Sequence, residues 1–253
     1  MKPKLTLVGA GPGDPELISL KGIKALKSAD VVLYDALVHP DLLDYCRPAT
    51  VTIFVGKRAG MHSYQQEKIN QMIVDHALSK GHVVRLKGGD PFIFGRGKEE
   101  IEYARAYGIE TEVVPGISSI NLPGYYGLPL TRRGINESFW VITAVTTNGE
   151  LSHDLELATR TNATVVVLMG LKKLDKIVQV FKAANKDELP VAIISKGSWS
   201  DGSLLMGKVK DIQQKVLKTN VAMPALIILG EAVGKQPEFY DEIEKLKSEF
   251  LKK

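Results

Sequence analysis

The chain has 253 residues, of which 44% are hydrophobic and 25% are charged, and its formal net charge is +4 at pH 7. These values are ordinary for a soluble globular protein, and no apolar run reaches the ~18 residues that span a bilayer, so we expect no membrane partner. Basic residues are scattered and aromatic residues make up only 7%, which argues against nucleic acid as a partner. The single Cys46 and an amino terminus without a signal-peptide pattern indicate a cytoplasmic protein.

The first half of the chain alternates short apolar runs with helical patterns. The apolar runs predict strands over 5–8, 31–34, 52–55, 82–86 and 112–114. Helices are predicted after the first strand, over 64–79 and over 98–107. The apolar face of the first helix comprises Leu17, Leu20, Ile23, Ala25 and Leu26. Such alternation favours a parallel sheet covered on both faces, so we predict an α/β domain over 1–114.

The second half predicts another α/β domain, over 115–253. Its predicted strands cover 139–143, 163–169, 191–195 and 225–229. A helix is predicted over 174–184, with a short segment at 209–216 between the later strands. The polar stretch 197–207 predicts a loop or a hairpin, and 238–253 predicts a charged amphipathic helix.

Glycine-rich loops follow several strands, at the edge where open α/β sheets bind ligands. The most informative loop reads Leu-Lys-Gly-Gly-Asp-Pro-Phe-Ile-Phe-Gly-Arg-Gly over 86–97, and an earlier one reads Gly-Ala-Gly-Pro-Gly-Asp-Pro over 9–15. The earlier loop is placed like a dinucleotide loop, but Pro12 lacks the N–H that a phosphate needs and Asp14 repels a pyrophosphate. A ligand with little negative charge fits better, and S-adenosylmethionine, with its cationic sulfonium, is such a ligand.

Eight motifs make the chain resemble the tetrapyrrole methylase family, and within it the methylases of uroporphyrinogen III. In family order they lie at 8–17, 29–35, 55–58, 86–100, 113–119, 129–133, 167–170 and 224–231. The resemblance implies two α/β domains with S-adenosylmethionine in the cleft between them, in a homodimer. It also implies two successive methylations of uroporphyrinogen III, at ring carbons two and seven, which yield precorrin-2 and S-adenosyl-L-homocysteine.

Family correspondence also implies which residues bind the cofactor and the substrate. The implied cofactor residues are Pro12, Gly88, Gly89, Asp90, Ile93, Ser118, Ser119, Met169, Gly197 and Ala225. The substrate carries eight carboxylates, which planar guanidinium groups match, so we expect Arg96 and Arg133 to bind its acetate or propionate groups. Further candidates for this role are Lys57, Arg58 and Arg132, the last standing where the family usually has His.

Attack by an electron-rich pyrrole carbon on a methyl group depends on orientation more than on a strong base. The chain accordingly shows neither a Ser/His/Asp grouping nor the His/Cys spacing of a metal site, and we predict no metal. A proton must still leave the ring, and Glu99 and Asp35 are the candidate acids, although Glu99 could instead orient Arg96. Two alternatives stay open: a related methylase of a later corrin precursor such as precorrin-4, and a non-catalytic S-adenosylmethionine-binding module.

Overall fold

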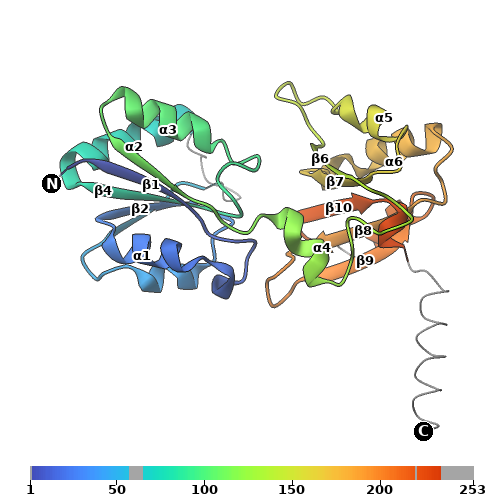
Figure 1. Cartoon of the computed structure of the whole chain (residues 1–253), viewed down its shortest axis with the longest axis horizontal. Helices are drawn as coiled ribbons and strands as arrows, with labels where there is room; N and C mark the ends of the chain where they lie inside the picture. Colours follow the sequence, from blue (N-terminus) through green and yellow to red (C-terminus); the bar gives the residue numbers. More distant parts are fainter. Residues whose placement is uncertain (1, 57–64, 220, 235–253) are drawn as a thin grey trace, which may run out of the picture. The chain divides into compact units, whose positions relative to one another are not determined.

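The structure is a computed structural model, and it describes residues 2–56, 65–219 and 221–234 (Figure 1). These residues form two compact units. The first comprises Met1–Tyr126 together with two later segments, Ile194–Leu204 and Ala222–Leu226, and the second contains the remainder. The predicted domain boundary follows Val114, which is the last residue of strand β5 (Glu110–Val114). That residues 1–114 fold independently of the rest of the chain stays a prediction.

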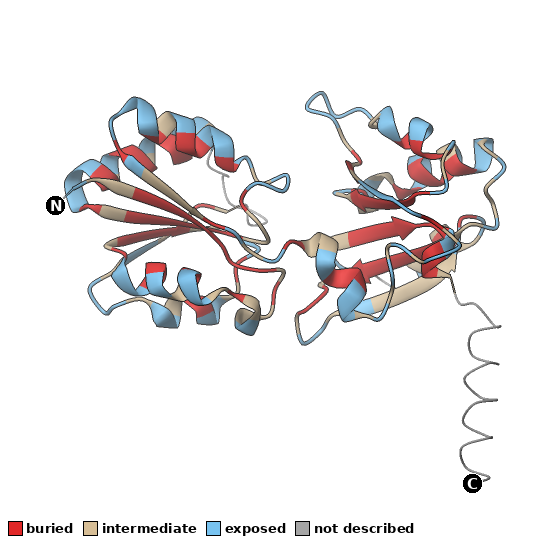
Figure 2. Cartoon of the chain, in the orientation of Figure 1, coloured by how far each residue is buried: buried red, intermediate tan, exposed pale blue. Residues whose placement is uncertain are grey.

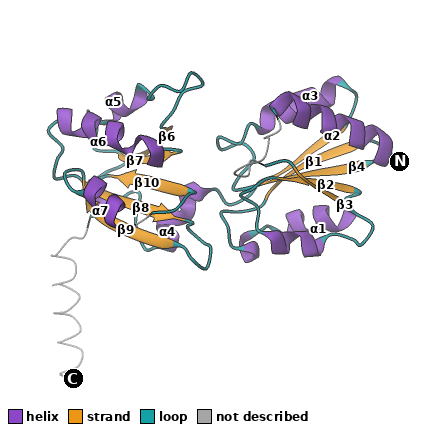
Figure 3. Cartoon of the chain, turned by 180° about the vertical axis from the view of Figure 1, so that it is seen from behind, coloured by secondary structure: helices purple, strands orange, loops and turns teal. Residues whose placement is uncertain are grey.

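The first unit contains a five-stranded sheet in the order β3-β2-β4-β1-β5, and all neighbouring strands run parallel. Besides β5, the strands are β1 (Lys4–Gly9), β2 (Val31–Tyr34), β3 (Val51–Phe54) and β4 (His82–Lys87). Helix α1 (Leu20–Ser28) covers one face, and α2 (Gln66–Lys80) and α3 (Gly97–Ala106) cover the other (Figures 1 and 3). The predicted parallel sheet with helices on both faces is therefore confirmed.

Two hydrophobic cores fill the spaces between this sheet and its helices, and the central strands β1, β2 and β4 are buried on both faces (Figure 2). Strand β4 contributes to both cores, because successive strand residues point to opposite faces. Val83 packs in the core with residues of α2 and α3, whereas Val84 and Leu86 pack in the core with residues of α1. The same alternation turns Arg85 and Lys87 toward α2 and α3, and both are almost fully buried.

The second sheet has the order β6-β7-β10-β8-β9, and β6 and β7 run parallel. Its strands are β6 (Phe139–Thr143), β7 (Thr164–Leu168), β8 (Pro190–Ser195), β9 (Ser203–Lys208) and β10 (Ala225–Leu229). The later helices are α4 (Leu122–Tyr125), α5 (Asp154–Ala158), α6 (Leu174–Ala183) and α7 (Ile212–Thr219). Short 3₁₀ helices cover Pro15–Leu17, Pro40–Tyr45, Ser119–Asn121, Leu171–Lys173 and Glu231–Val233.

Every predicted strand occurs, but the predicted apolar face of the first helix needs correction. Leu20 is 78% exposed, so its predicted place on the buried face is wrong. It is the first residue of helix α1, directly after the Ser19 cap, where the helix has no preceding turn to cover it. Leu17 lies in the preceding 3₁₀ helix. The two segments that the sequence left open are resolved: 209–216 contains the start of helix α7, and 197–207 leads into strand β9, which neighbours β8 in the sheet.

Helices α4 and α5 were not predicted, because four or five residues are too few to establish a helical period. The helix predicted over 238–253 lies outside the described residues. Within the part of the chain that the structure describes, no helix has the length and apolar character needed to cross a membrane.

Candidate functional site

Three neighbouring strand ends of the first unit approach one another through glycines. Gly9 ends β1, Gly89 follows β4 and Gly116 follows β5. A Cβ atom on Gly9 would lie 2.5 Å from the Cα of Gly116, and one on Gly116 would lie 2.4 Å from the carbonyl oxygen of Gly89. Since side chains cannot occupy such short distances, only glycine fits at positions 9 and 116, while position 89 favours glycine through its left-handed φ of 68°. We refer to Gly9, Gly89 and Gly116 as the glycine floor.

Hydrogen bonds join the loops that contain the glycine floor. The Gly89 N–H donates to the Gly11 carbonyl oxygen at 2.7 Å, and the Gly11 N–H donates to the Gly89 oxygen at 3.3 Å. Asp90 adds a further connection: its Oδ1 accepts from the Phe92 N–H at 2.7 Å and its Oδ2 from the Gly116 N–H at 3.1 Å. Both carboxylate oxygens of Asp90 therefore hold the backbone of the site in place.

The loop between β4 and α3 contains two residues with left-handed backbone. Phe94 and Arg96 have φ values of 53° and 58°, a conformation that is uncommon outside glycine and that concentrates at functional sites. The half-exposed Arg96 side chain pairs with Glu99 in a bidentate arrangement, Nε to Oε1 at 2.9 Å and Nη2 to Oε2 at 2.6 Å. These hydrogen bonds lower the pKa of Glu99 and raise the pKa of Arg96. Glu99 thus fixes the direction of the Arg96 guanidinium.

The residues predicted to bind the cofactor fall mainly in the first unit. The loops after β1, β4 and β5 carry Pro12, Gly88, Gly89, Asp90, Ile93, Ser118 and Ser119. Gly197 and Ala225 lie in the two late segments that join this unit, and Met169 belongs to the second unit. Met169 is 60% exposed and has a left-handed φ of 57°.

The late segment that carries Gly197 is tied to the first part of the chain. The Tyr126 hydroxyl donates to the Gly197 carbonyl oxygen at 2.6 Å, and the Asp14 N–H donates to the Ser198 Oγ at 2.9 Å. The ring of Trp199 stacks near that of His39, with 4.7 Å between centroids. The structure therefore brings Gly197 to the loop after β1, a proximity that only the family resemblance had implied.

Of the residues predicted to act on the substrate, Asp35 lies at the end of β2. Its Oδ1 accepts from the Leu37 N–H at 3.0 Å, and its Oδ2 lies 3.5 Å from Arg85 Nη2. Asp35, Arg96 and Glu99 all belong to the first unit. Lys57 and Arg58 lie outside the described residues.

Arg133 is exposed and belongs to the second unit, on a loop that a buried asparagine holds. Asn136 Oδ1 accepts from the Arg132 N–H at 2.9 Å, and Asn136 Nδ2 donates to the carbonyl oxygens of Leu130 and Ser138, each at 2.9 Å. Sequence reasoning missed this role, because a single asparagine in a polar loop carries no distinguishing pattern.

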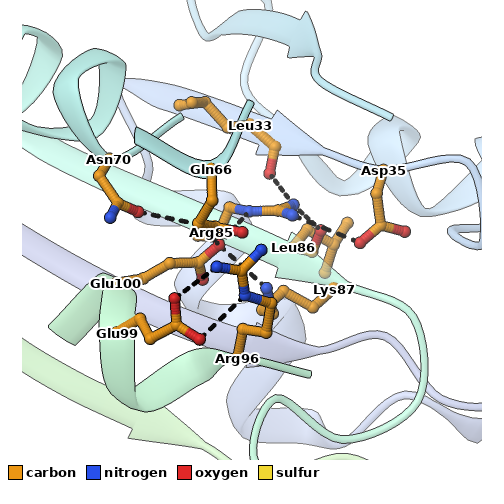
Figure 4. A network of polar contacts seen from close by, with 10 residues as sticks. All are labelled: Leu33, Asp35, Gln66, Asn70, Arg85, Leu86, Lys87, Arg96, Glu99 and Glu100. Atoms are coloured by element: carbon orange, nitrogen blue, oxygen red, sulfur yellow. Dashed lines mark hydrogen bonds and ion pairs between the residues drawn. The ribbon is translucent and has the colours of Figure 1, made fainter. Parts of the chain in front are cut away.

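A buried ionic network in the first unit was also missed (Figure 4). Glu100 Oε1 accepts from Lys87 Nζ at 3.0 Å, from Gln66 Nε2 at 3.1 Å and from Arg85 Nε at 3.2 Å. Burial lowers the pKa of Lys87, and the nearby positive charge of Arg85 lowers it further. We refer to Arg85, Lys87 and Glu100 as the buried triad.

Signals for the buried triad were present in the sequence. Arg85 and Lys87 occupy alternate positions of an otherwise apolar strand, which places both on one face. Glu100 shares its helix face with the buried residues Gly97, Ile101 and Ala104. No group of three or more His, Cys, Asp or Glu side chains that could hold a metal ion occurs among the described residues.

Comparison with known proteins agrees with this arrangement of fold and loops. Residues 4–213 match the family model described as tetrapyrrole (corrin/porphyrin) methylases. The chain belongs to the tetrapyrrole methylase family. It is 44% identical over 237 residues to a uroporphyrinogen-III C-methyltransferase of Methanocaldococcus jannaschii, a match that covers 92% of this chain and 98% of the relative. The chain spans less than half the length of the siroheme synthases of Psychrobacter that it also matches.

Two solved structures show the same fold. A uroporphyrin-III C-methyltransferase from Thermus thermophilus in complex with S-adenosyl homocysteine is 38% identical, with a TM-score of 0.78 and coverage of 91% of this chain and 98% of that one. A cobalt precorrin-4 methyltransferase has a TM-score of 0.81 but is only 28% identical, with coverage of 92% and 96%. The predicted α/β fold of tetrapyrrole methylases is confirmed.

Proposed function

We propose that the chain has the activity of a uroporphyrinogen-III C-methyltransferase and converts uroporphyrinogen III to precorrin-2 by two successive methylations at carbons two and seven. The observation that carries this proposal is the 44% identity to the Methanocaldococcus jannaschii relative, which extends over 98% of that protein. The family match over residues 4–213 includes the loops after β1, β4 and β5. The higher identity to uroporphyrinogen methylases than to the precorrin-4 enzyme, 38% against 28% among the solved structures, favours this substrate.

The first unit fits S-adenosylmethionine better than a dinucleotide. The glycine floor presents backbone in place of side chains, Pro12 offers no N–H to a phosphate, and the Asp90 carboxylate would repel a pyrophosphate. When bound, S-adenosylmethionine supplies an activated methyl group on a cationic sulfonium. We expect it to be held by Pro12, Gly88, Gly89, Asp90, Ile93, Ser118, Ser119, Met169, Gly197 and Ala225. The bound S-adenosyl homocysteine of the Thermus thermophilus structure supports this choice of cofactor.

Arg96 and Arg133 are the residues that we expect to bind substrate carboxylates, since both are exposed guanidinium groups on loops. The lowered pKa of Glu99 makes it a weaker proton acceptor than an ordinary carboxylate, because protonation would break its bidentate pair with Arg96. This favours an orienting role for Glu99 and leaves Asp35, whose contact with Arg85 Nη2 is longer at 3.5 Å, as the carboxylate that receives the proton leaving the ring.

The direct test is incubation of the purified protein with uroporphyrinogen III and S-adenosylmethionine, followed by mass spectrometry of the tetrapyrrole. We expect a mass gain of two methyl groups and a product that oxidises to a fluorescent species. A gain only on a later corrin precursor would select the precorrin-4 type of enzyme. Binding of S-adenosylmethionine without methylation of any tetrapyrrole would select a non-catalytic module.

We further propose that the protein is a cytoplasmic homodimer. The single cysteine supports a reducing compartment, and the family resemblance supports the dimer. Light scattering in solution should give twice the chain mass of 27.7 kDa. A mass of one chain at micromolar concentration would contradict the dimer.

A further inference from the structure

The buried triad spans the space between strand β4 and helix α3. Arg85 and Glu100 are 4% and 0% exposed, and Lys87 is 5% exposed. Glu100 Oε1 accepts from both cationic side chains, whereas Glu100 Oε2 has no hydrogen-bond partner among the described residues. Burying three charges is costly, and well-packed apolar residues often stabilise a core as well or better. The triad is therefore poorly explained by stability alone.

Arg85 extends the triad to the edge of the sheet where the ligand loops lie. Its Nη2 lies 3.5 Å from Asp35 Oδ2, and its Nη1 donates to the carbonyl oxygens of Leu86 at 2.9 Å and Leu33 at 3.4 Å. Leu33 lies on β2, the strand that Asp35 follows. Arg85 therefore contacts both the backbone of β2 and the Asp35 carboxylate. Figure 4 shows the Arg85 guanidinium between Glu100 and Asp35.

Glu100 connects the same network to helix α3. It directly follows Glu99, which orients the Arg96 guanidinium. The two neighbouring carboxylates therefore bind different arginines. Glu99 is half-exposed and points to Arg96, while Glu100 is buried and points to Arg85. The first turn of α3 and the end of β2 are thereby fixed relative to each other within the first unit.

We propose that Arg85 and Glu100 are positioning residues of the methylation site: Glu100 holds the Arg85 guanidinium, and Arg85 presents the Asp35 carboxylate as the acceptor of the ring proton. This rests on the proposed function, in which Asp35 receives that proton. A guanidinium is required because one group must reach a carboxylate on each side and two carbonyl oxygens, and a lysine ammonium lacks this planar fork.

Replacement of the whole triad by apolar residues separates positioning from stability. In the variant Arg85→Met/Lys87→Met/Glu100→Leu no buried charge is left unpaired, and Gln66 keeps its hydrogen bond to Asn70. We expect a Tm close to that of the unsubstituted protein and an unchanged Kd for S-adenosyl homocysteine by calorimetry. We expect kcat with uroporphyrinogen III to fall by about tenfold to a hundredfold, at or below the lower end of the ~10²–10⁴-fold that a positioned acid or base contributes, because the proton acceptor is displaced and not removed.

The decisive measurement is whether this loss depends on Asp35. In an Asp35→Asn background, the triad replacement should cause no further loss of kcat, because the group that it positions is already absent. An equal loss in both backgrounds, or a folded triad variant with full kcat, would overturn the proposal. If the triad variant does not fold, Arg85→Lys serves instead, since it keeps the charge beside Glu100, and the same dependence on Asp35 is expected.

The matched control is the exposed ion pair Lys98–Glu102 on the same helix, with 3.4 Å between its charged atoms. Its replacement, Lys98→Met/Glu102→Leu, should leave kcat and the Kd for S-adenosyl homocysteine unchanged. Failure of the proposed function has a separate signature, since the unsubstituted protein would then add no methyl group to uroporphyrinogen III. That result would overturn the positioning role as well.

Discussion

A methyl group added at Gly116 would meet the backbone of two other strand ends, the Gly89 oxygen at 2.4 Å and the Gly9 Cα at 2.6 Å. These atoms cannot rotate away as a side chain does, so the loops themselves must shift. We expect Gly116→Ala to lower the free energy of unfolding by about 1–3 kcal/mol, as overpacking does. Displacement of the glycine floor should also weaken S-adenosyl homocysteine binding by about tenfold, or ~1.4 kcal/mol, in calorimetry.

Gly124→Ala is the control for this change, because no atom lies within 4 Å of a Cβ built there. Gly124 stands inside helix α4, where alanine is favoured over glycine, so its stability should stay equal or rise by up to ~1 kcal/mol. Equal effects of the two substitutions would show that crowding at the glycine floor is not the cause.

Substitution of Arg96 tests whether its guanidinium binds a substrate carboxylate. Arg96→Ala should raise KM for uroporphyrinogen III by about tenfold or more, as expected for loss of a charge-assisted hydrogen bond worth ~1.5–3 kcal/mol. The Kd for S-adenosyl homocysteine should change little. Glu99→Gln should raise KM less, because it disturbs the direction of the guanidinium without removing it. An equal loss of cofactor and substrate binding in Arg96→Ala would contradict the assignment.

At the scale of the element, edge strand β5 is joined to its neighbours by Glu112. The carboxylate accepts from Lys21 of α1 at 2.6 Å and from Lys4 of β1 at 2.7 Å, and these hydrogen bonds lower its pKa to about 2. Its ordinary pKa is 4.5, so between these values the unfolded chain binds more protons than the folded one. The stabilisation is therefore complete above about pH 5 and is lost as the pH falls toward 2.

Glu112→Gln should lower the free energy of unfolding at pH 7 by ~1 kcal/mol or less, since the group is partly exposed and screened by solvent. Urea unfolding at a series of pH values should show this difference shrinking between pH 5 and pH 2. Glu110→Gln, which removes a more exposed partner of Lys2, is the control and should have a smaller effect. A difference that stays constant down to pH 2 would rule out the carboxylate charge as its origin.

Strand β4 shows what a sequence can and cannot reveal at this scale. Its position, direction and glycine-rich end follow from an apolar run and turn residues, and the structure confirms them. The inward direction of Arg85 and Lys87 also follows from the two-residue period, yet their partner could not be predicted. Glu100 stands 13 residues beyond Lys87 on a helix whose rotation depends on tertiary packing. Charged residues are nearly always exposed unless they are paired. The burial of Glu100 therefore could not be predicted from the sequence without knowledge of its partners.

For the whole molecule, the class of fold was predictable because strands and helices alternate along the chain. The assignment of segments to the first unit was not. Ile194–Leu204 joins that unit through contacts such as Trp199 with His39, more than 150 residues apart in sequence. Gly197 could be placed near the other cofactor loops only by family resemblance. Single long-range hydrogen bonds, such as the one from the Tyr126 hydroxyl to the Gly197 carbonyl oxygen, produce no repeating pattern in the sequence.

The predicted boundary after Val114 can be tested by separating folding from binding. All residues of the two cores of the first sheet lie between Leu5 and Val114, so a fragment of residues 1–114 contains every strand of that sheet. We expect this fragment to unfold cooperatively in circular dichroism, with a Tm below that of the whole chain.

The fragment should nevertheless bind S-adenosyl homocysteine too weakly for calorimetry, since it lacks Gly116, Ser118, Ser119, Gly197 and Ala225. A longer fragment, 1–126, restores the anchor between Gly116 and Asp90 and should gain stability, while binding stays weak without the late segments. If 1–114 unfolds without a cooperative transition and 1–126 unfolds with one, the folding boundary follows Tyr126. Folding of the first unit would then require the residues that also build its ligand site.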